Sequence, residues 1–307
     1  MPRNSSKHHY LLIVNPEAGS RSTMKALPAI ESLLRARGAQ YEFHFTKERG
    51  HATELVRDLG SDFDVIVSVG GDGTINEIIN GMPEIDKPMG ILPIGTGNDF
   101  ARSCSMQPGA LEESVNVLMA HDVKEIDVGL VNGRRFINAM GMGFEGHGSD
   151  IARKLPFLKG TLKYLFAIGI TYLSYRRIPL KVRFNDIALD GKVFMLSLGN
   201  GWNVGGGLQL TPKAIIDDGL FDVCYVKNIS RLRILQVFTK LYDGTIDQVN
   251  EYKLYQTNEL HIESDRPIPA HFDGESFDPV QTEFKVSIIP KAVKIIGNWS
   301  ADNRFSK

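Results

Sequence analysis

The segment Val65–Met82, with the sequence VIVSVGGDGTINEIINGM, restricts the fold of this chain more than any other segment. It opens with a short β-branched apolar run, which is typical of a buried parallel strand. Three glycines and one aspartate follow, and apolar residues then recur at helical spacing until Gly81 and Pro83 end the helix. A strand that turns through glycines into a helix presents free backbone N–H groups and the positive end of a helix dipole. The segment therefore predicts a phosphate-binding site.

One carboxylate, that of Asp72, lies within this glycine loop. A carboxylate at this position would repel a phosphate, so the loop predicts a cation between the two. The loop lacks the G-x-x-x-x-G-K-[ST] pattern, which disfavours a P-loop NTPase. A tight strand-to-helix turn that uses glycine only for its backbone stays open as the plainer interpretation.

The first part of the chain alternates strands with helices. Apolar runs predict strands at Tyr10–Val14, Tyr41–Thr46 and Met89–Pro93, and helices ending near Arg37 and spanning His51–Leu59. This alternation predicts a doubly wound parallel sheet, in which ligands bind beyond the carboxyl ends of the strands. Turn-forming residues follow two of the strands: Asn15-Pro16-Glu17-Ala18-Gly19 and Ile94-Gly95-Thr96-Gly97-Asn98-Asp99-Phe100. Both segments fall at such ends, although a plain strand-to-helix loop is an equal interpretation for the first.

The sequence pattern changes from about Asp127: short runs of strand-forming residues alternate with turns, and helical patterns become scarce. This pattern predicts an antiparallel sandwich or barrel domain. The expected strands are Arg135–Ala139, Leu180–Phe184, Val193–Leu198, Phe221–Val226, Leu260–Glu263 and Phe284–Ile289. A last strand, Val293–Ile296, is expected to return to the first domain.

A single helix, Gly160–Tyr175, is expected to interrupt the second domain. We expect its apolar residues to face the core, and contact with a membrane interface is the alternative. Arg176 and Arg177 follow it and suit either anionic head groups or water. A G-x-G-x-x-G pattern at Gly141 opens no clear amphipathic helix, so we do not interpret it as a dinucleotide site.

Composition excludes several classes of protein. A net charge of −1 gives no electrostatic case for nucleic acid. Cys104 and Cys224 are the only cysteines, which suits a reducing cytoplasm and excludes a cysteine-based zinc cluster. No window approaches the roughly 18 apolar residues that span a bilayer. A lipid substrate would therefore imply a cytoplasmic protein that visits the membrane surface peripherally, and the sequence leaves a homodimer open.

Two further clusters carry chemistry. The run Asp217-Asp218-Gly219-Leu220-Phe221-Asp222 places three carboxylates around a turn, and such oxygen ligands suit Mg²⁺ or Ca²⁺. A solvated acidic turn is an equal interpretation. Asp273-Gly274-Glu275 follows an expected strand end, and a glutamate in such a turn beside a phosphate site can take a hydroxyl proton.

Taken together, these segments resemble the soluble diacylglycerol kinase and sphingosine kinase-like lipid kinases, from Asn15 to the C-terminal strand. The matching motifs are Asn15-Pro16 with Gly19, Gly70 to Glu77, Pro93 with Gly95 to Ala101, Asp218-Gly219 and Asp273-Gly274-Glu275. The glycine loop alone is not specific, because NAD kinases and 6-phosphofructokinases carry close relatives of it. The resemblance implies an α/β domain of the NAD kinase and phosphofructokinase type at 1–128. It also implies an antiparallel β-sandwich substrate domain at 129–288 and a returning segment at 289–307.

The resemblance also implies an ATP- and Mg²⁺-dependent kinase that phosphorylates diacylglycerol or a similar lipid alcohol. Glu275 would be the general base. Asp72 would join Asp99 and Asp127 in a carboxylate network that reaches the catalytic Mg²⁺, and Asp218 would hold a separate structural Mg²⁺ with the carbonyls of Ile215 and Leu220. The implied ATP contacts are Asn15, Pro16, Glu17, Ala18, Gly19, Thr46, Gly71, Asp72, Gly73, Thr74, Ile75, Asn76, Glu77 and Thr96.

The chain departs from the family pattern after Thr46, where Gly50-His51-Ala52 replaces the usual Gly-Asp-Ala. The resemblance therefore does not carry over an acidic contact at this position, and a titrating His51 would make activity pH-sensitive. Two alternatives stay open, an NAD kinase-like enzyme and a catalytically silent nucleotide sensor. The acceptor also stays open among diacylglycerol, sphingosine, ceramide and phosphatidylglycerol, as does a role in phospholipid synthesis or in signalling.

Overall fold

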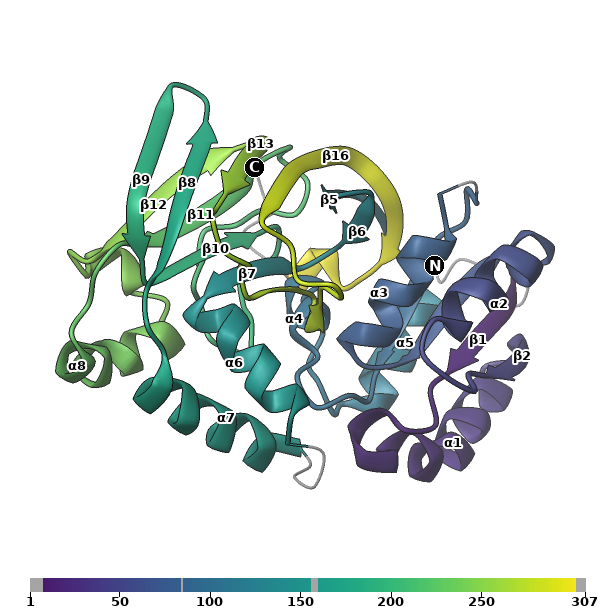
Figure 1. The fold of residues 1–307 in the computed structure, drawn as a ribbon. Helices are drawn as coiled ribbons and strands as arrows, with labels where there is room; N and C mark the ends of the chain where they lie inside the picture. The colour runs from purple at the N-terminus through teal and green to yellow at the C-terminus, as the bar shows by residue number, and fades with distance from the viewer. Residues whose placement is uncertain (1–7, 84, 156–159, 302–307) are drawn as a thin grey trace. The chain divides into compact units, whose positions relative to one another are not determined.

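A computed structural model describes residues 8–83, 85–155 and 160–301, with side chains left undescribed at 160–165. The chain divides into two compact units (Figure 1). The first unit combines Met1–Ile126 with Lys291–Lys307, and the second comprises Asp127–Pro290.

The first unit contains a parallel sheet with the strand order β2-β1-β3-β4. Its strands are β1 (His9–Val14), β2 (Gln40–Phe45), β3 (Val65–Gly70) and β4 (Met89–Pro93). All residues of β3 and β4 are buried, which is why both read as unbroken apolar runs. The predicted doubly wound α/β domain is confirmed, and Met89–Pro93 is predicted to the residue.

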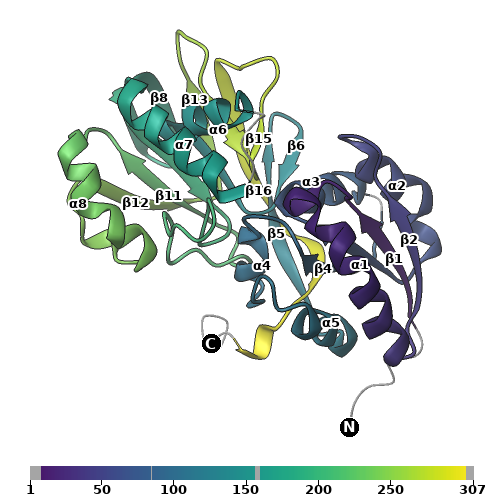
Figure 2. The same cartoon turned by 90° about the horizontal axis from the view of Figure 1, so that it is seen from below.

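Helices connect these strands and cover both faces of the sheet, as the burial of β3 and β4 requires. α1 packs with α5, and α2 packs with α3 (Figures 1 and 2). The helices are α1 (Ala18–Ala36), α2 (His51–Leu59), α3 (Asp72–Gly81), α4 (Asp99–Ser103) and α5 (Leu111–Ala120), with a 3₁₀ turn at Gly60–Asp62.

The second unit is built mainly from antiparallel strands. One sheet has the order β12-β11-β10-β7-β14-β15, and its pairs are antiparallel throughout. Its strands are β7 (Ala139–Gly143), β10 (Met195–Gly199), β11 (Phe221–Val226), β12 (Tyr252–Thr257), β14 (Ala270–Phe272) and β15 (Glu275–Ser276). Further strands pair as β13-β8-β9 and β5-β6: β5 (Val123–Val131), whose first four residues belong to the first unit, β6 (Arg134–Phe136), β8 (Ile178–Phe184), β9 (Ile187–Val193) and β13 (Glu259–Glu263).

The strand β16 (Glu283–Ile296) takes part in both units. Its first half pairs with β13 in antiparallel fashion, and Ile295 near its end pairs in parallel with Met89 of β4. The two strands expected at Phe284–Ile289 and Val293–Ile296 are therefore one continuous strand. Figure 1 shows β16 as a strongly curved ribbon, and Lys291 within it has a φ of 50°.

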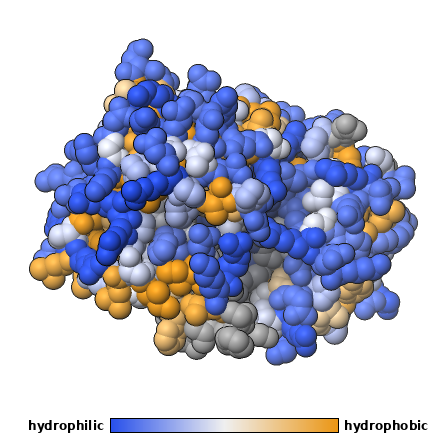
Figure 3. Space-filling model, viewed as in Figure 1, coloured by the Kyte–Doolittle hydropathy of each residue, from blue (hydrophilic) through white to orange (hydrophobic). Residues whose placement is uncertain are grey.

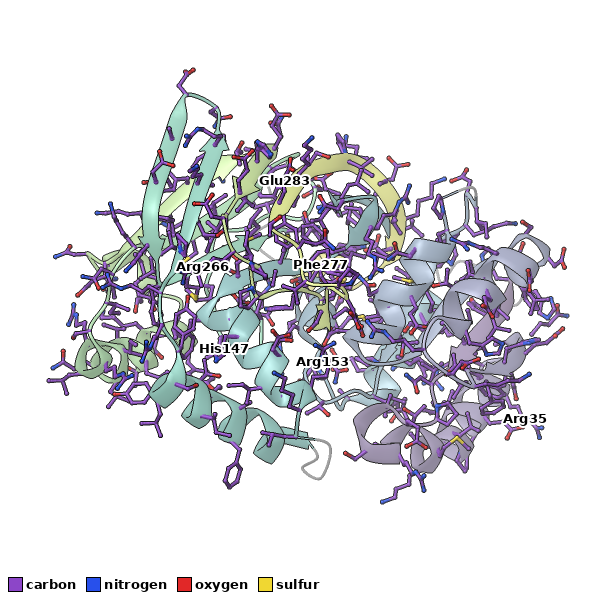
Figure 4. All side chains as sticks on the ribbon, viewed as in Figure 1. Arg35, His147, Arg153, Arg266, Phe277 and Glu283 are labelled. Carbon is purple, nitrogen blue, oxygen red and sulfur yellow. The ribbon has the colours of Figure 1, made fainter. Side chains whose placement is uncertain are left out.

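The core of the second unit follows the alternation of side chains along a strand. Leu196 and Leu198 of β10 pack with Ile262 and Phe284 from the other sheet, while Met195 packs on the opposite face with the helices. Phe277, labelled in Figure 4, has its ring 4.8 Å from the ring of Phe284. This core, closed by residues from two sheets, confirms the predicted sandwich.

The described residues of the second unit form three helices, not one: α6 (Phe144–Arg153), α7 (Gly160–Ser174) and α8 (Arg231–Tyr242), with a 3₁₀ turn at Ile246–Gln248. The expectation of a single helix was wrong. α6 begins at Phe144, inside the pattern formed by Gly141, Gly143 and Gly146, which we expected to open no clear amphipathic helix. A Cβ at Gly146 would clash with the main chain of Pro269, so α6 packs through glycine rather than through an apolar stripe.

The expectation that α7 buries its apolar residues in the core was also wrong where it can be judged. Phe166, Ile170 and Leu173 are exposed, whereas Ala167 and Thr171 are buried. The side chains of Leu162 and Leu165 lie outside the described residues. Within the described residues, no helix combines the length and the apolar character that crossing a bilayer requires.

Candidate active site

The strand order of the first unit places two predicted loops side by side. From β1 the chain adds β2 on one side and then β3 and β4 on the other, so the strand order reverses between β1 and β3. Ligands of such sheets bind beyond the carboxyl ends of the strands at this point. The loop after β1 begins at Asn15, whose backbone N–H donates to the Val69 carbonyl at 3.0 Å. The Asn15 side-chain nitrogen donates to the Thr74 hydroxyl at 3.2 Å. The structure thus joins the Asn15–Gly19 loop to the glycine loop.

The two glycine loops also pack against each other, and this contact requires glycine. A Cβ at Gly95 would clash with the Cα of Gly71. Asn98 fixes the second loop, because its side-chain oxygen accepts the Gly95 N–H at 2.8 Å and its nitrogen donates to the Gly95 carbonyl at 2.8 Å. The bare backbone of both loops is therefore held in one place.

Two of the predicted carboxylates of the first unit flank the same point. A Cβ at Gly97 would lie 3.1 Å from Asp72 Oδ2 and 3.2 Å from Asp99 Oδ2. The other oxygen of Asp72 accepts the Phe100 N–H at 3.1 Å. Burial raises the pKa of Asp72, and the backbone N–H groups around it oppose this shift. Both Oδ2 atoms therefore border the glycine backbone.

The other residues predicted to contact the nucleotide differ in burial and in the hydrogen bonds that they already make. Ile75 is buried in the core, so its side chain is not available to a ligand. Glu77 caps α2, because its Oε2 accepts the Ala52 N–H at 3.1 Å. Thr46 follows β2 and donates its N–H to the Val14 carbonyl at 2.9 Å. Buried positions are Thr74 and Asn76, half-buried ones are Pro16, Ala18, Gly19, Thr46, Gly71 and Gly73, and exposed ones are Glu17 and Thr96.

The departure from the family pattern at His51 has a structural role. The His51 Nδ1 atom accepts the Lys47 N–H at 3.1 Å and closes the loop that precedes α2. Since Glu77 caps the same helix, this loop is held without an aspartate. The pH-sensitivity expected from His51 stays a prediction.

In the second unit, Asp127 is tied to the acidic turn. It is fully buried, its Oδ2 accepts the Gly219 N–H at 2.6 Å, and its own N–H donates to the Ile216 carbonyl at 2.7 Å. Asp218 Oδ1 accepts the Leu220 N–H at 3.0 Å, which closes the turn. The structure thus brings Asp127 together with the Ile215–Leu220 segment.

Asp222 adds an acidic group to this turn. It is 7% exposed, and its Oδ2 atom has no hydrogen-bond partner among the described residues. Burial raises the pKa of Asp222 to about 6; a hydrogen bond from Gln256 opposes the shift and the nearby Asp218 charge adds to it. A buried carboxylate oxygen without a donor, beside a second carboxylate, is a position that suits a cation.

Asp273 holds the turn that carries Glu275. Its carboxylate accepts three backbone N–H groups, from Ile137 at 2.7 Å, Asn138 at 2.9 Å and Ala139 at 3.0 Å. Glu275 is half-buried at the start of β15, opposite Phe272. The turn is therefore fixed to the start of β7.

The end of the acidic turn, at Asp222, and the turn that carries Glu275 are connected through laterally paired residues of neighbouring strands. Asp222 pairs with Gly199, Gly199 pairs with Ala139, and the Asp273 N–H donates to the Ala139 carbonyl. Three strand spacings separate Asp222 from Asp273, which amounts to about 14 Å. A cation held at Asp218 would therefore be remote from Glu275.

Sequence reasoning missed two buried asparagines that hold these loops. Asn200 donates to the carbonyls of Asp127 at 2.9 Å and of Ile137 at 2.7 Å. Asn138 donates to the Asn203 carbonyl at 2.9 Å. Each asparagine stands at or next to the end of an apolar strand run, and that position was the available signal.

A half-buried ion pair joins His271 of β14 to Glu145 of α6. His271 Nε2 is 3.0 Å from Glu145 Oε1, and the side chains are 11% and 14% exposed. Burial alone lowers the pKa of His271, but the hydrogen bond to Glu145 and the charges of Glu145 and Asp273 hold this pKa above its usual value. The pair links α6 to β14.

We expect Asp273→Asn to destabilise the protein by about 1–3 kcal/mol. An amide in place of Oδ2 points a second donor at the Ile137 N–H, which is left buried and unpaired. The free energy of urea unfolding measures the loss. Asp186→Asn, at an exposed position in the β8–β9 turn, is the control and should change it by less than about 0.5 kcal/mol. Equal stability of the two variants would contradict the role of Asp273.

We expect the Glu145–His271 pair to make stability fall as pH rises. Because the folded-state pKa of His271 is raised above about 6.5, the contribution is fully present below that pH and is lost as pH rises through the folded value. One proton gives a slope of at most about 1.4 kcal/mol per pH unit. Urea unfolding from about pH 6 to 9 should show a flatter profile for His271→Gln than for the control His261→Gln. Identical profiles would exclude this source of pH dependence.

Comparison with known proteins agrees with this geometry. The diacylglycerol kinase catalytic domain family matches residues 9–131, and the YegS C-terminal NAD kinase beta sandwich-like domain family matches residues 138–297. The chain is 29% identical over 282 residues to a diacylglycerol kinase of Bacillus subtilis (strain 168), which covers 89% of this chain and 91% of that protein. It is also 29% identical over 272 residues to a protein of Chromohalobacter salexigens named as a YegS-like lipid kinase, covering 85% of each.

A crystal structure named as that of a diacylglycerol kinase from Bacillus anthracis str. Sterne shares the architecture. It is 28% identical, with a TM-score of 0.80, over 96% of this chain and 97% of that chain. Both domain families occur in this chain in order, and together they span most of its length. The chain therefore belongs to the diacylglycerol kinase-like family of lipid kinases.

Proposed function

We propose that this protein transfers the γ-phosphoryl group of ATP, with Mg²⁺, to the hydroxyl of diacylglycerol or a similar lipid alcohol. The observation that carries the proposal is the pair of contacting glycine loops at the switch point, with an oxygen of Asp72 and one of Asp99 both next to Gly97. Phosphoryl transfer depends on positioned phosphates and on neutralised charge. The first unit offers groups suited to both.

The residues present fit ATP. α3 begins at Asp72, after the extended Gly71, whose carbonyl accepts the Thr74 N–H at 3.0 Å, so only the N–H groups before Thr74 have no carbonyl partner within the helix. A phosphate at this end gains hydrogen bonds and a favourable dipole. The absence of a Cβ at Gly97 leaves space beside Asp72 Oδ2 and Asp99 Oδ2. Asn15, Thr46 and Thr96 would complete the contacts.

The residues present also fit Mg²⁺. Asp72 and Asp99 would hold the catalytic ion, and Asp127 is proposed to join them. Asp218, with the carbonyls of Ile215 and Leu220, would hold a structural ion, which the unpartnered Asp222 oxygen supports. When bound, Mg²⁺ would supply positive charge that offsets the negative charge of the phosphates.

Glu275 is proposed to accept the proton of the lipid hydroxyl. Its turn is anchored by the Asp273 carboxylate, so the position of its backbone is fixed before any substrate binds. A carboxylate that removes the hydroxyl proton makes the oxygen a better nucleophile. The other residues of the proposed site would bind and orient the two substrates.

A panel of acceptors tests the proposal. Transfer of label from γ-labelled ATP is measured to diacylglycerol, sphingosine, ceramide, phosphatidylglycerol and NAD side by side. We expect a labelled lipid product and no labelled NAD. Labelled NAD alone would favour the NAD kinase-like alternative, and ATP binding without any product would favour a silent sensor.

A further inference from the structure

Glu275, the proposed proton acceptor, stands at the edge of its sheet. Its strand β15 is the last in the strand order and, within the described residues, pairs with β14 alone. A two-residue turn joins these two strands. Both of its residues, Asp273 and Gly274, have a positive φ, of 47° and 83°, as a type I′ hairpin turn requires. The position of Glu275 therefore depends on how β14 is held.

The helix α6 packs on this hairpin without an apolar stripe. It contacts both β14 and β15, yet the residues buried within it are Gly146 and Ala152. Its contact with α7 involves another glycine, because Gly148 lies beside the Thr171 hydroxyl. The exposed apolar side chains of α7 point away from α6, and Figure 3 shows hydrophobic residues gathered where Figure 1 places α7. Apolar packing alone therefore fixes α6 only weakly.

The three glycines of the G-x-G-x-x-G pattern bring the start of α6 close to the sheet at β14. A Cβ at Gly146 would clash with the main chain of Pro269, and the Gly143 N–H donates to the Pro269 carbonyl at 3.2 Å. A Cβ at Gly141 would take the space that the Glu145 carboxylate fills. The pattern therefore serves the contact between a helix and a strand, which is a role other than nucleotide binding.

The ion pair of Glu145 with His271 is the polar contact that this close approach allows. Glu145 Oε2 and His271 Nδ1 are both buried and have no hydrogen-bond partner among the described residues. Each charge therefore depends on the other, because a buried charge that loses its partner is strongly destabilising. The pair holds α6 to β14 most firmly while His271 carries its proton, since a neutral imidazole leaves the Glu145 charge uncompensated.

The groups that face His271 favour its protonated form. Burial lowers the pKa of His271, but the hydrogen bond from it to Glu145 and the Glu145 charge raise this pKa above its usual value. Asp273 of the hairpin turn and Asp150 of α6 add to the rise. Cys224 of β11 lies near Glu145, and burial keeps its thiol neutral by raising the pKa of that thiol. The residues paired with His271 in the sheet are uncharged.

We propose that the Glu145–His271 pair positions Glu275 for proton transfer, because it holds α6 against β14 and so fixes the edge strand β15. Both members of the pair are positioning residues, since neither is assigned a contact with a substrate. The inference rests on the proposed function, in which Glu275 is the proton acceptor. As the pH rises, His271 releases its proton to solvent, Glu145 loses the charge of its partner, and β15 is held less firmly.

The pH dependence of phosphoryl transfer to lipid tests this role. In the wild type, kcat should fall as the pH rises through the folded-state pKa of His271, which lies above about 6.5. In His271→Gln we expect kcat near pH 6 to be about tenfold lower, a smaller loss than a displacement of about 1 Å can cause. The alkaline fall should be absent, and KM for ATP should be unchanged because the glycine loops belong to the other unit.

Glu145→Gln is the second variant, and it should reproduce both effects. The double variant should be no slower than either single variant, because the two side chains act as one pair. His261→Gln is the matched control. His261 pairs with Glu283 at 2.8 Å, but both side chains are more exposed, at 37% and 50%, and the wild-type pH profile should remain.

Hydrogen exchange without nucleotide or lipid tests the same role independently of kinase activity. The backbone N–H groups of residues 271–276 should exchange faster in His271→Gln and in Glu145→Gln, at a temperature where thermal melts show every variant folded. The β8–β9 hairpin of the same unit should exchange as in the wild type. Faster exchange confined to β14 and β15 distinguishes a released hairpin from a general loss of stability.

Wild-type kcat and pH profile in both variants would overturn the inference, as would an equal loss of kcat in His261→Gln. Slower transfer with unchanged exchange at 271–276 would also overturn it, because the pair would then not hold the hairpin. If the wild type forms no labelled lipid, the proposed function fails and exchange alone decides. Faster exchange confined to 271–276 then supports the hold of the pair on β15, and unchanged exchange overturns it.

Discussion

Replacing Glu275 by Gln should lower phosphoryl transfer to lipid by about 10²- to 10⁴-fold. The amide keeps the size of the side chain but cannot accept the hydroxyl proton. Because Glu275 belongs to the second unit and the glycine loops belong to the first, the affinity for ATP should stay unchanged. Steady-state rates with a saturating lipid, and a direct ATP-binding isotherm, measure the two quantities separately.

Glu259→Gln is the matched control for this substitution. Glu259 is an exposed glutamate at the start of β13, another strand of the same unit, and the same chemical change there should leave turnover intact. Wild-type turnover by Glu275→Gln would remove the general-base role from Glu275. Equal losses of turnover in both variants would point to a change in the whole unit rather than in the proton acceptor.

Gly95→Ala should lower phosphoryl transfer about a hundredfold, because it displaces the two glycine loops from each other. The added methyl group clashes with the Cα of Gly71, which is backbone, and comes within 2.7 Å of Asn98 Oδ1, the atom that accepts the Gly95 N–H. ATP affinity should fall together with the rate, since the displaced loops are the proposed phosphate-binding groups. ATP-binding isotherms and kcat/KM measure both effects.

Gly169→Ala makes the same chemical change in the helix α7, where an added Cβ meets nothing within 4 Å. It should leave ATP affinity and turnover unchanged. Thermal melts of both variants distinguish a displaced loop from a lost fold, as overpacking alone costs about 1–3 kcal/mol. Full ATP affinity in Gly95→Ala would show that the contact between the loops does not position the nucleotide.

The parts of the fold that could be predicted from the sequence are those with a strong local signal. β3 and β4 are buried on both faces, so their apolar runs stand out. α3 follows from the glycine turn and the spacing of its isoleucines. α8 was missed because Leu232 and Leu235 are exposed while Val237 and Leu241 are buried, which blurs the apolar stripe of the helix.

The candidate site was predictable where its residues are close in the chain. The glycine loops and Asp72 are visible in the sequence itself. The contacts of Asp273 with the backbone at Ile137–Ala139 span about 135 residues and follow from tertiary packing alone. The same holds for Asp127, whose bond to Gly219 crosses 92 residues and which no local pattern indicates.

The most direct test of the proposed activity is label transfer from γ-labelled ATP to diacylglycerol in mixed micelles, with Mg²⁺ and with a chelator. Our account predicts labelled phosphatidic acid that requires Mg²⁺ and that Glu275→Gln almost abolishes. A labelled product that forms equally with the chelator present, or no labelled lipid from protein that binds ATP, would contradict it.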